Sequence, residues 1–97
     1  MSSYVYIVRC SDGSYYVGHS DDLEKRIAAH NQGAIPGYTH TRRPIKLAFA
    51  DQFATREEAL EREIQIKGWS RAKKEALIKG NWKRLEGLSR TPYGRLQ

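Results

Sequence analysis

The sequence contains little cysteine and no long apolar stretch, and each shortage excludes a class of protein. Its single cysteine, Cys10, cannot form an internal disulfide or a zinc site built from several cysteines. The longest apolar run, Tyr4–Val8, has five residues, whereas a membrane-spanning helix needs about 20. The N-terminus also lacks the basic segment and long apolar stretch of a secretion signal. We therefore expect a soluble, cytoplasmic protein without a membrane partner.

The chain has the length and composition of one folded domain. It has 97 residues, of which 39% are hydrophobic and 29% are charged, a mixture too apolar for a disordered chain. We expect a single domain over residues 1–88. A loose basic tail is predicted over residues 89–97, where Pro92 and Gly94 disfavour a regular element.

The positive charge is concentrated at the C-terminal end. The formal net charge is +6. Residues 1–66 contain eight basic and nine acidic side chains, whereas residues 67–97 contain nine basic and two acidic ones. Phosphate backbones attract such a segment by counterion release, so nucleic acid is the leading partner, although charge does not distinguish DNA from RNA. A basic tail that only maintains solubility explains the charge equally well.

Local patterns predict three strands and three helices. Residues 4–10 and 15–19 are aromatic and β-branched and flank Asp12-Gly13, which is typical of a β-hairpin, and residues 45–53 form a third strand. Ser20 and Asp21 are the candidate N-caps of the first helix. The predicted helices cover residues 22–32, 55–67 and 70–79. This order, β-β-α-β-α-α, predicts an α+β fold in which helices flank a small antiparallel sheet.

The geometry of the hairpin decides whether two of its tyrosines can share a site. If Asp12-Gly13 forms a two-residue turn, Tyr6 pairs with His19, and strand alternation places Tyr6 and Tyr16 on opposite faces of the sheet. A shared site therefore requires a three-residue loop, a bulge or a strong local twist near Gly18.

Three polar side chains stand on otherwise apolar helix faces. Arg26 and His30 emerge together at the margin of the buried face of the first helix. The predicted buried face of the second helix is marked by Ala59, Leu60, Ile64 and Lys67. Glu63 falls within this face, and a carboxylate there needs a cation, either an arginine or a metal ion.

Hydrolysis of a phosphodiester bond needs residues of these types. A hydroxyl or carboxylate takes the proton of the attacking water, a divalent cation stabilises the leaving oxygen, and an arginine neutralises charge on phosphorus. The hairpin tyrosines, Arg26, His30 and Glu63 could supply all three. A single glutamate is sufficient for Mg²⁺, which keeps several waters and also binds phosphate oxygens.

The order of these residues resembles the GIY-YIG nuclease superfamily, in particular its small single-domain bacterial members of unassigned role. The matching segments, between Tyr4 and Ile78, are Tyr4-Val5-Tyr6, Tyr16-Val17-Gly18, Leu23–Arg26, His30 and Glu58–Glu63. The ordered set is far more specific than either tripeptide alone. The first tripeptide is Tyr-Val-Tyr rather than Gly-Ile-Tyr, but it keeps the tyrosine hydroxyl.

The resemblance implies a metal-dependent DNA endonuclease, with a role in DNA repair or recombination. It places the hydroxyls of Tyr6 and Tyr16 in the site, one of them as the general base, with Arg26 as the catalytic arginine and His30 as an assisting residue. It assigns Glu63 to binding Mg²⁺ or Mn²⁺. The expected nucleic-acid-binding residues are His19, His40, Arg42, Arg43, Lys73, Lys74, Lys83 and Arg84.

Each residue taken alone also has a structural interpretation. Tyrosine favours strands, so we assign Tyr4 and Tyr15 to packing, and Trp69 and Trp82 to packing rather than base stacking. Two other functions stay open: a nucleic-acid-binding module of the same fold with weak or no catalysis, and an adaptor that binds a partner through the basic C-terminal helices. The sequence does not determine the oligomeric state.

Overall fold

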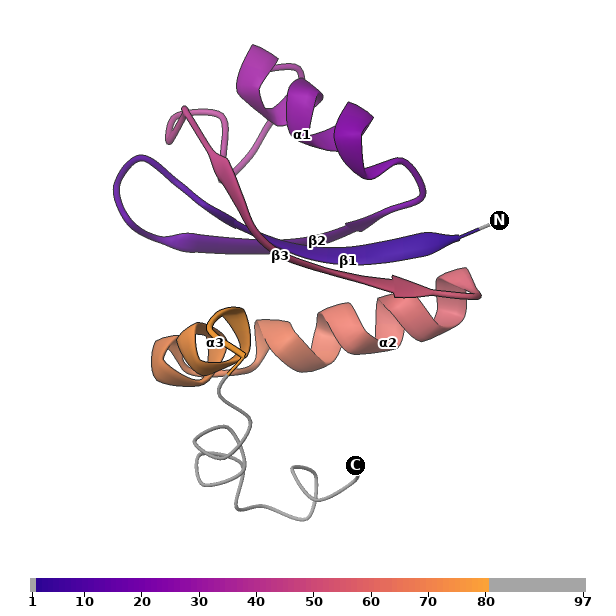
Figure 1. Cartoon of the computed structure of the whole chain (residues 1–97). Coiled ribbons are helices and arrows are strands. Elements are labelled where there is room, and N and C mark those ends of the chain that lie inside the picture. The colour runs from indigo at the N-terminus through magenta and orange to yellow at the C-terminus, as the bar shows by residue number, and fades with distance from the viewer. Residues whose placement is uncertain (1, 81–97) are drawn as a thin grey trace. The chain divides into compact units, whose positions relative to one another are not determined.

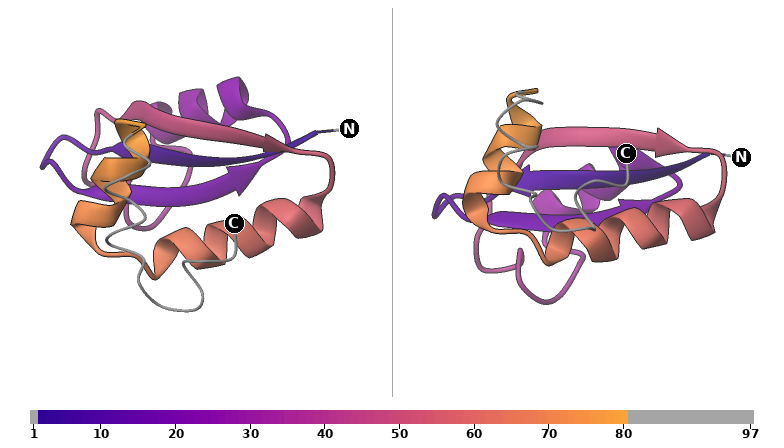
Figure 2. Two further views of the ribbon diagram at one scale, coloured as in Figure 1. Left: turned by 60° about the horizontal axis from the view of Figure 1, so that its bottom comes forward. Right: turned by 90° about the horizontal axis from the view of Figure 1, so that it is seen from below.

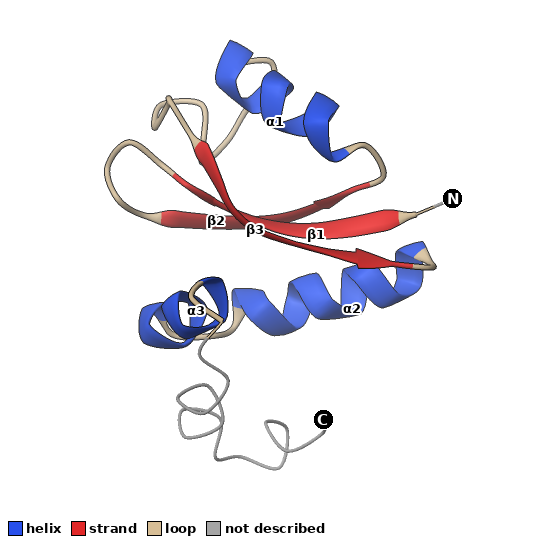
Figure 3. Ribbon diagram, viewed as in Figure 1, coloured by secondary structure: helices blue, strands red, loops and turns tan. Residues whose placement is uncertain are grey.

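The computed structural model describes residues 2–80 and has the predicted element order (Figures 1 and 3). The elements are β1 (Ser3–Arg9), β2 (Tyr15–Ser20), α1 (Leu23–Gln32), β3 (Lys46–Phe53), α2 (Arg56–Lys67) and α3 (Arg71–Ile78). They form the α+β fold expected from the sequence. The chain divides into two compact units, Met1–Lys67 and Gly68–Gln97. The expected domain boundary between residues 88 and 89 lies outside the described residues, as do Trp82, Lys83 and Arg84.

The first unit is a three-stranded antiparallel sheet with a helix on each face. The strand order is β2-β1-β3, so β1 is central and β2 forms one edge (Figure 2). Helix α1 covers one face of the sheet and α2 covers the opposite face (Figure 1). Every residue of β1 therefore faces one helix or the other, according to the alternation of the strand.

The hairpin has a three-residue loop, so the pairing expected from a two-residue turn is wrong. Tyr6 pairs with Gly18, and Val8 pairs with Tyr16. The amide of Cys10 donates to the carbonyl of Ser14 at 2.8 Å, and Gly13 closes the loop at φ 86°, a conformation that glycine adopts without steric cost. Because the register moves by one residue, Tyr6 and Tyr16 share the face of the sheet that α1 covers.

Helix α1 begins at Leu23, one residue later than predicted. Asp22 is the N-cap and accepts a hydrogen bond from the amide of Lys25, whereas Ser20 accepts from the amide of Asp22. Gly33 ends the helix at φ 76°, as predicted. The apolar cluster beneath α1 contains Tyr6, Val8, Cys10 and Ile45, with Tyr16, Leu23 and Ile27 packed against it.

Helix α2 has the predicted capping box but a different buried face. Thr55 and Glu58 exchange side-chain-to-amide hydrogen bonds at 3.2 and 3.3 Å. The residues buried on this helix are Ala59, Glu63 and Ile66. The prediction that Leu60 and Ile64 belong to the buried face was wrong, since these residues are 41% and 64% exposed. The helix rests on the sheet along the i, i+4, i+7 stripe, which places the Glu63 carboxylate in line with apolar residues.

The second unit is described from Gly68 to Gly80. Ser70 caps α3 by accepting a hydrogen bond from the amide of Lys73, as predicted. The ammonium of Lys73 lies 4.3 Å from the centroid of the Trp69 ring. None of the helices in the described part of the chain is long and apolar enough to cross a membrane.

Candidate active site

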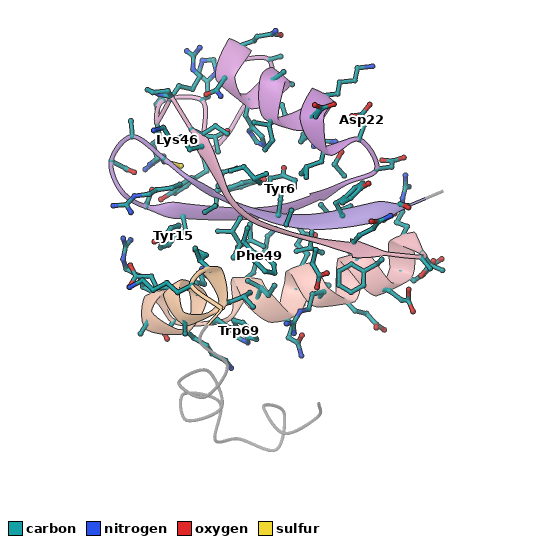
Figure 4. The ribbon with its side chains drawn as sticks, viewed as in Figure 1. Tyr6, Tyr15, Asp22, Lys46, Phe49 and Trp69 are labelled. Carbon is teal, nitrogen blue, oxygen red and sulfur yellow. The ribbon has the colours of Figure 1, made fainter. Side chains whose placement is uncertain are left out.

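The candidate site is organised around a tyrosine that lies across a glycine of the edge strand. A Cβ atom on Gly18 would be 2.5 Å from the hydroxyl oxygen of Tyr6 and 2.6 Å from Cζ. Only glycine leaves room for the phenol at this position. The ring, on the α1 face of the sheet (Figure 4), therefore extends from the central strand over β2.

A chain of hydrogen bonds leads from this tyrosine into the interior. The hydroxyl of Tyr6 lies 2.9 Å from Nε2 of His30, and Nδ1 of His30 lies 2.8 Å from Oγ1 of Thr39. His30 and Thr39 are each 1% exposed. Burial lowers the pKa of His30, and the positive charge of Arg26 lowers it further. His30 is therefore a neutral imidazole at pH 7.

The pKa of Tyr6 reflects its burial and the charges around it. Burial raises this pKa to about 12, and the charges of Tyr16 and Glu63 act in the same direction. Arg26 opposes the rise through its charge and through a hydrogen bond to Tyr6. Charges from β2, α1 and α2 thus act on one hydroxyl of β1, although α2, which carries Glu63, covers the opposite face of the sheet.

Tyr16 and the loop after α1 form one wall of the site. The Tyr16 ring packs edge-on against His30 with 5.6 Å between centroids, and it stacks on Tyr38 with 6.1 Å between centroids. On Tyr38, the guanidinium carbon of Arg42 lies 3.9 Å from the ring centroid. This aromatic and cationic contact series joins the loop to the hairpin.

Glu63 is held between two cationic or potentially cationic side chains. Its side chain is 8% exposed, Oε1 lies 2.6 Å from Nδ1 of His19, and Oε2 lies 3.1 Å from Nζ of Lys67. His19 therefore contacts Glu63, and its contact with nucleic acid stays a prediction. The cation opposite this carboxylate is the Lys67 ammonium, whereas the sequence analysis expected an arginine or a metal ion.

The donor set fits a metal ion that takes few protein ligands. Within residues 2–80, no group of three or more His, Cys, Asp or Glu side chains could hold a metal. Mg²⁺ commonly uses one or two carboxylates together with water and phosphate oxygens. Glu63 could serve as that carboxylate. Its Oε2 already binds one positive charge, the half-exposed Lys67 ammonium, and a metal ion could take the place of that ammonium. His19 would orient Oε1, as partners of metal-binding carboxylates do.

The basic residues of the loop after α1 differ in their surroundings. The Arg42 side chain donates from Nε to Asp12 at 3.0 Å and from Nη1 to the carbonyl of Tyr38 at 2.8 Å. Arg43 donates to the carbonyl of His40 at 2.8 Å. Arg43 and His40 line an open hollow with Asn31, Thr41 and Pro44. Contact of Arg42, Arg43 and His40 with nucleic acid stays a prediction, as it does for Lys73 and Lys74.

Sequence reasoning missed two residues of this arrangement, Thr39 and Tyr38. Thr39, Tyr38 and Lys67 contact His30, Tyr16 and Glu63 respectively. Lys67 was visible as a possible i, i+4 partner of Glu63. For Thr39 and Tyr38, the only sequence signal was their place in a polar loop, because no helical or strand period connects that loop to the other site residues.

Sequence and structure comparisons relate the chain to one family of known proteins. Residues 2–76 match the GIY-YIG catalytic domain. The chain is 52% identical over 75 residues to a UPF0213 protein of Staphylococcus saprophyticus, covering 77% of this chain and 92% of that protein. The solution structure of a UPF0213 protein of Bacillus halodurans has a TM-score of 0.54 at 42% identity, covering 81% and 84% of the two chains. That of an E. faecalis protein has a TM-score of 0.58 at 36% identity, covering 82% and 85%.

Proposed function

Because the chain belongs to the GIY-YIG catalytic-domain family, a nuclease family, we propose that it is a divalent-metal-dependent endonuclease that hydrolyses DNA phosphodiester bonds. The observation that carries the proposal is the 2.9 Å contact between the Tyr6 hydroxyl and Nε2 of a buried, neutral His30. We also propose that it acts in the cytoplasm, in DNA repair or recombination.

Tyr6 is the general base in this proposal, with His30 as its proton acceptor. The attacking water gives its proton to the Tyr6 oxygen while the Tyr6 hydroxyl gives its own proton to Nε2 of His30. Tyr6 is protonated at pH 7 because its pKa is about 12, so it acts by passing on a proton rather than as a free phenolate. The 2.9 Å contact favours Tyr6 over Tyr16 for this role.

Arg26 is the group that stabilises negative charge at phosphorus. Its positive charge lowers the pKa of Tyr6, so it acts where the attacking water would be activated, and it would act on a phosphate beside Tyr6 as well. A bound phosphate would also offset the charge through which Arg26 lowers the pKa of His30. Substrate binding would then make His30 a better proton acceptor.

Glu63 would hold the Mg²⁺ or Mn²⁺ ion. When bound, such an ion neutralises charge on phosphate oxygens and on the leaving oxygen. His19 keeps one carboxylate oxygen oriented, and Lys67 would have to leave the other. Lys67 is long and half-exposed, so it can move into solvent without unfolding α2.

A nucleic-acid-binding module without turnover is the second candidate function. It is favoured by the pairing of both oxygens of Glu63 with His19 and Lys67. If these contacts persist in the presence of metal and DNA, no oxygen of this carboxylate is available to a metal ion. Binding would then occur without hydrolysis.

The two candidates predict different results in one cleavage assay. The full chain is incubated with supercoiled plasmid, branched DNA, single-stranded DNA or RNA, in Mg²⁺, Mn²⁺ or chelator. The proposal expects metal-dependent DNA cleavage that Tyr6→Phe and Glu63→Gln abolish. The matched controls are Tyr15→Phe, on the opposite face of the sheet (Figure 4), and Glu61→Gln, on the exposed face of α2; both should cleave normally. Salt-sensitive binding with no cleavage under any condition would establish the second candidate.

A further inference from the structure

Thr39 is a buried hydroxyl whose contact the proposed reaction does not yet explain. It lies in the loop between α1 and β3, is 1% exposed, and places Oγ1 2.8 Å from Nδ1 of His30. The other ring nitrogen of His30 faces Tyr6 at 2.9 Å. Both nitrogens of one imidazole are thus engaged within the protein, one by the general base and one by Thr39.

The direction of each hydrogen bond follows from where the imidazole carries its proton. A neutral imidazole has one N–H donor and one acceptor nitrogen, while a hydroxyl can donate or accept. Tyr6 is 1% exposed and its hydroxyl lies 2.9 Å from Nε2 of His30, so the buried O–H needs that nitrogen as its acceptor. Nε2 of His30 can accept only if the ring proton is on Nδ1, and Nδ1–H then donates to Thr39.

We propose that Thr39 is a positioning residue that holds the proton of His30 on Nδ1, so that Nε2 is free to receive the proton of Tyr6. The inference rests on the proposed function for its catalytic consequence, but the position of the ring proton is a property of the free protein. Without the Thr39 hydroxyl, the proton can move to Nε2, and His30 then donates to Tyr6 instead of accepting from it.

The surroundings of Thr39 fix its hydroxyl relative to His30. The amide of Arg42 donates to the Thr39 carbonyl at 3.0 Å. The side chain of Arg42 binds the Tyr38 carbonyl and the carboxylate of Asp12 in the hairpin loop, and the amide of Ser11 donates to the Arg42 carbonyl at 2.9 Å. Arg42 therefore fastens the segment that carries Thr39 to the hairpin that carries Tyr6.

The first test locates the proton without any substrate or metal. Long-range proton–nitrogen NMR spectra of the imidazole distinguish a protonated ring nitrogen from an unprotonated one. We expect Nδ1 of His30 to be protonated in the wild-type chain and in Thr39→Ser. In Thr39→Val, which keeps the shape but removes the hydroxyl, the share of rings protonated on Nε2 should rise. A wild-type His30 protonated on Nε2, or an unchanged ratio in Thr39→Val, would overturn the proposal.

The second test measures the consequence for cleavage. Thr39→Val should lower kcat roughly tenfold with little change in KM, because one buried hydrogen bond that orients a catalytic group is lost. Thr39→Ser should restore most of the rate, whereas Glu61→Gln, on the exposed face of α2, should cleave as the wild type does. Equal kcat in Thr39→Val and wild type would contradict the proposal.

The two tests separate this inference from the proposed function. If no DNA is cleaved by any form but the ring proton is on Nδ1 and depends on Thr39, the proposed function fails and the positioning role stands. If DNA is cleaved but the ring proton is on Nε2, the positioning role fails alone. Should Thr39→Val not fold, the wild-type and Thr39→Ser spectra still decide where the proton lies.

Discussion

Replacing Gly18 with alanine should displace the Tyr6 hydroxyl from His30. The added Cβ atom would be 2.5 Å from the Tyr6 oxygen, about 0.9 Å less than the 3.4 Å of ordinary van der Waals contact. Gly18 lies in β2 without a positive φ, so alanine causes no backbone strain there and the whole effect comes from this clash. A movement of this size is large enough to break the 2.9 Å contact with Nε2 of His30.

The expected loss is larger in cleavage than in stability. A displacement of about 1 Å in a catalytic group costs on the order of 100-fold in rate, while overpacking at one site costs about 1–3 kcal/mol of unfolding free energy. The effects of Gly18→Ala and Tyr6→Phe on the cleavage rate should not be additive, because both substitutions remove the same contact. The double variant should therefore cleave no more slowly than Tyr6→Phe alone.

The assay is a four-member cycle of initial plasmid-cleavage rates, with urea unfolding of each variant to show that it is folded. Metal and DNA concentrations are held constant. A Gly18→Ala protein that cleaves at the wild-type rate would show that the position of Tyr6 does not matter. Losses that multiply in the double variant would show that Gly18 acts through something other than Tyr6.

Three further predictions concern the charges around the site. The pKa of Tyr6 is raised from 10.0 to about 12, so the unfolded state loses this proton first as pH rises. Between these two pH values, the free energy of unfolding should fall by about 2–3 kcal/mol more in the wild type than in Tyr6→Phe, as measured by urea unfolding. Lys67→Ala frees Oε2 of Glu63 and should tighten Mn²⁺ binding by up to about fivefold in titration calorimetry, whereas Lys67→Arg should not; weaker binding in Lys67→Ala would oppose a metal at Glu63. Neutralising Lys73, Lys74, Lys83 and Arg84 should weaken DNA binding in anisotropy titrations and flatten its salt dependence by about 0.9 per lost phosphate contact; an unchanged slope would remove these residues from the interface.

Elements with local signals were predictable because their cause is local. The capping box of Thr55 and Glu58 and the left-handed Gly33 at the end of α1 satisfy backbone groups only a few residues away. Their sequence spacing therefore contains the relevant geometry. The stripe of residues that α2 buries was harder to predict from the sequence. The predicted and the observed stripes both have helical spacing, and only packing against the sheet selects between them. Leu60 and Ile64 are exposed for this reason.

The sequence by itself determined the order of elements and the fold, and it indicated which residues are candidates for the site. The order of Tyr6, Tyr16, Arg26, His30 and Glu63 indicated the family, although their mutual positions did not follow from it. The hairpin register illustrates the difference, since one extra loop residue decides whether the two tyrosines share a face.

Only the tertiary structure decided how these groups interact. It places Oγ1 of Thr39 2.8 Å from Nδ1 of His30, and it packs the ring of Tyr6 against Gly18. It also pairs His19 with Glu63 over 44 positions of sequence. These contacts join segments that no local period relates, and they depend on ångström-scale packing of two helices and a loop against one twisted sheet. The chemistry of the site arises from those distances, because a proton moves along a hydrogen bond and a charge acts most strongly on its near neighbours.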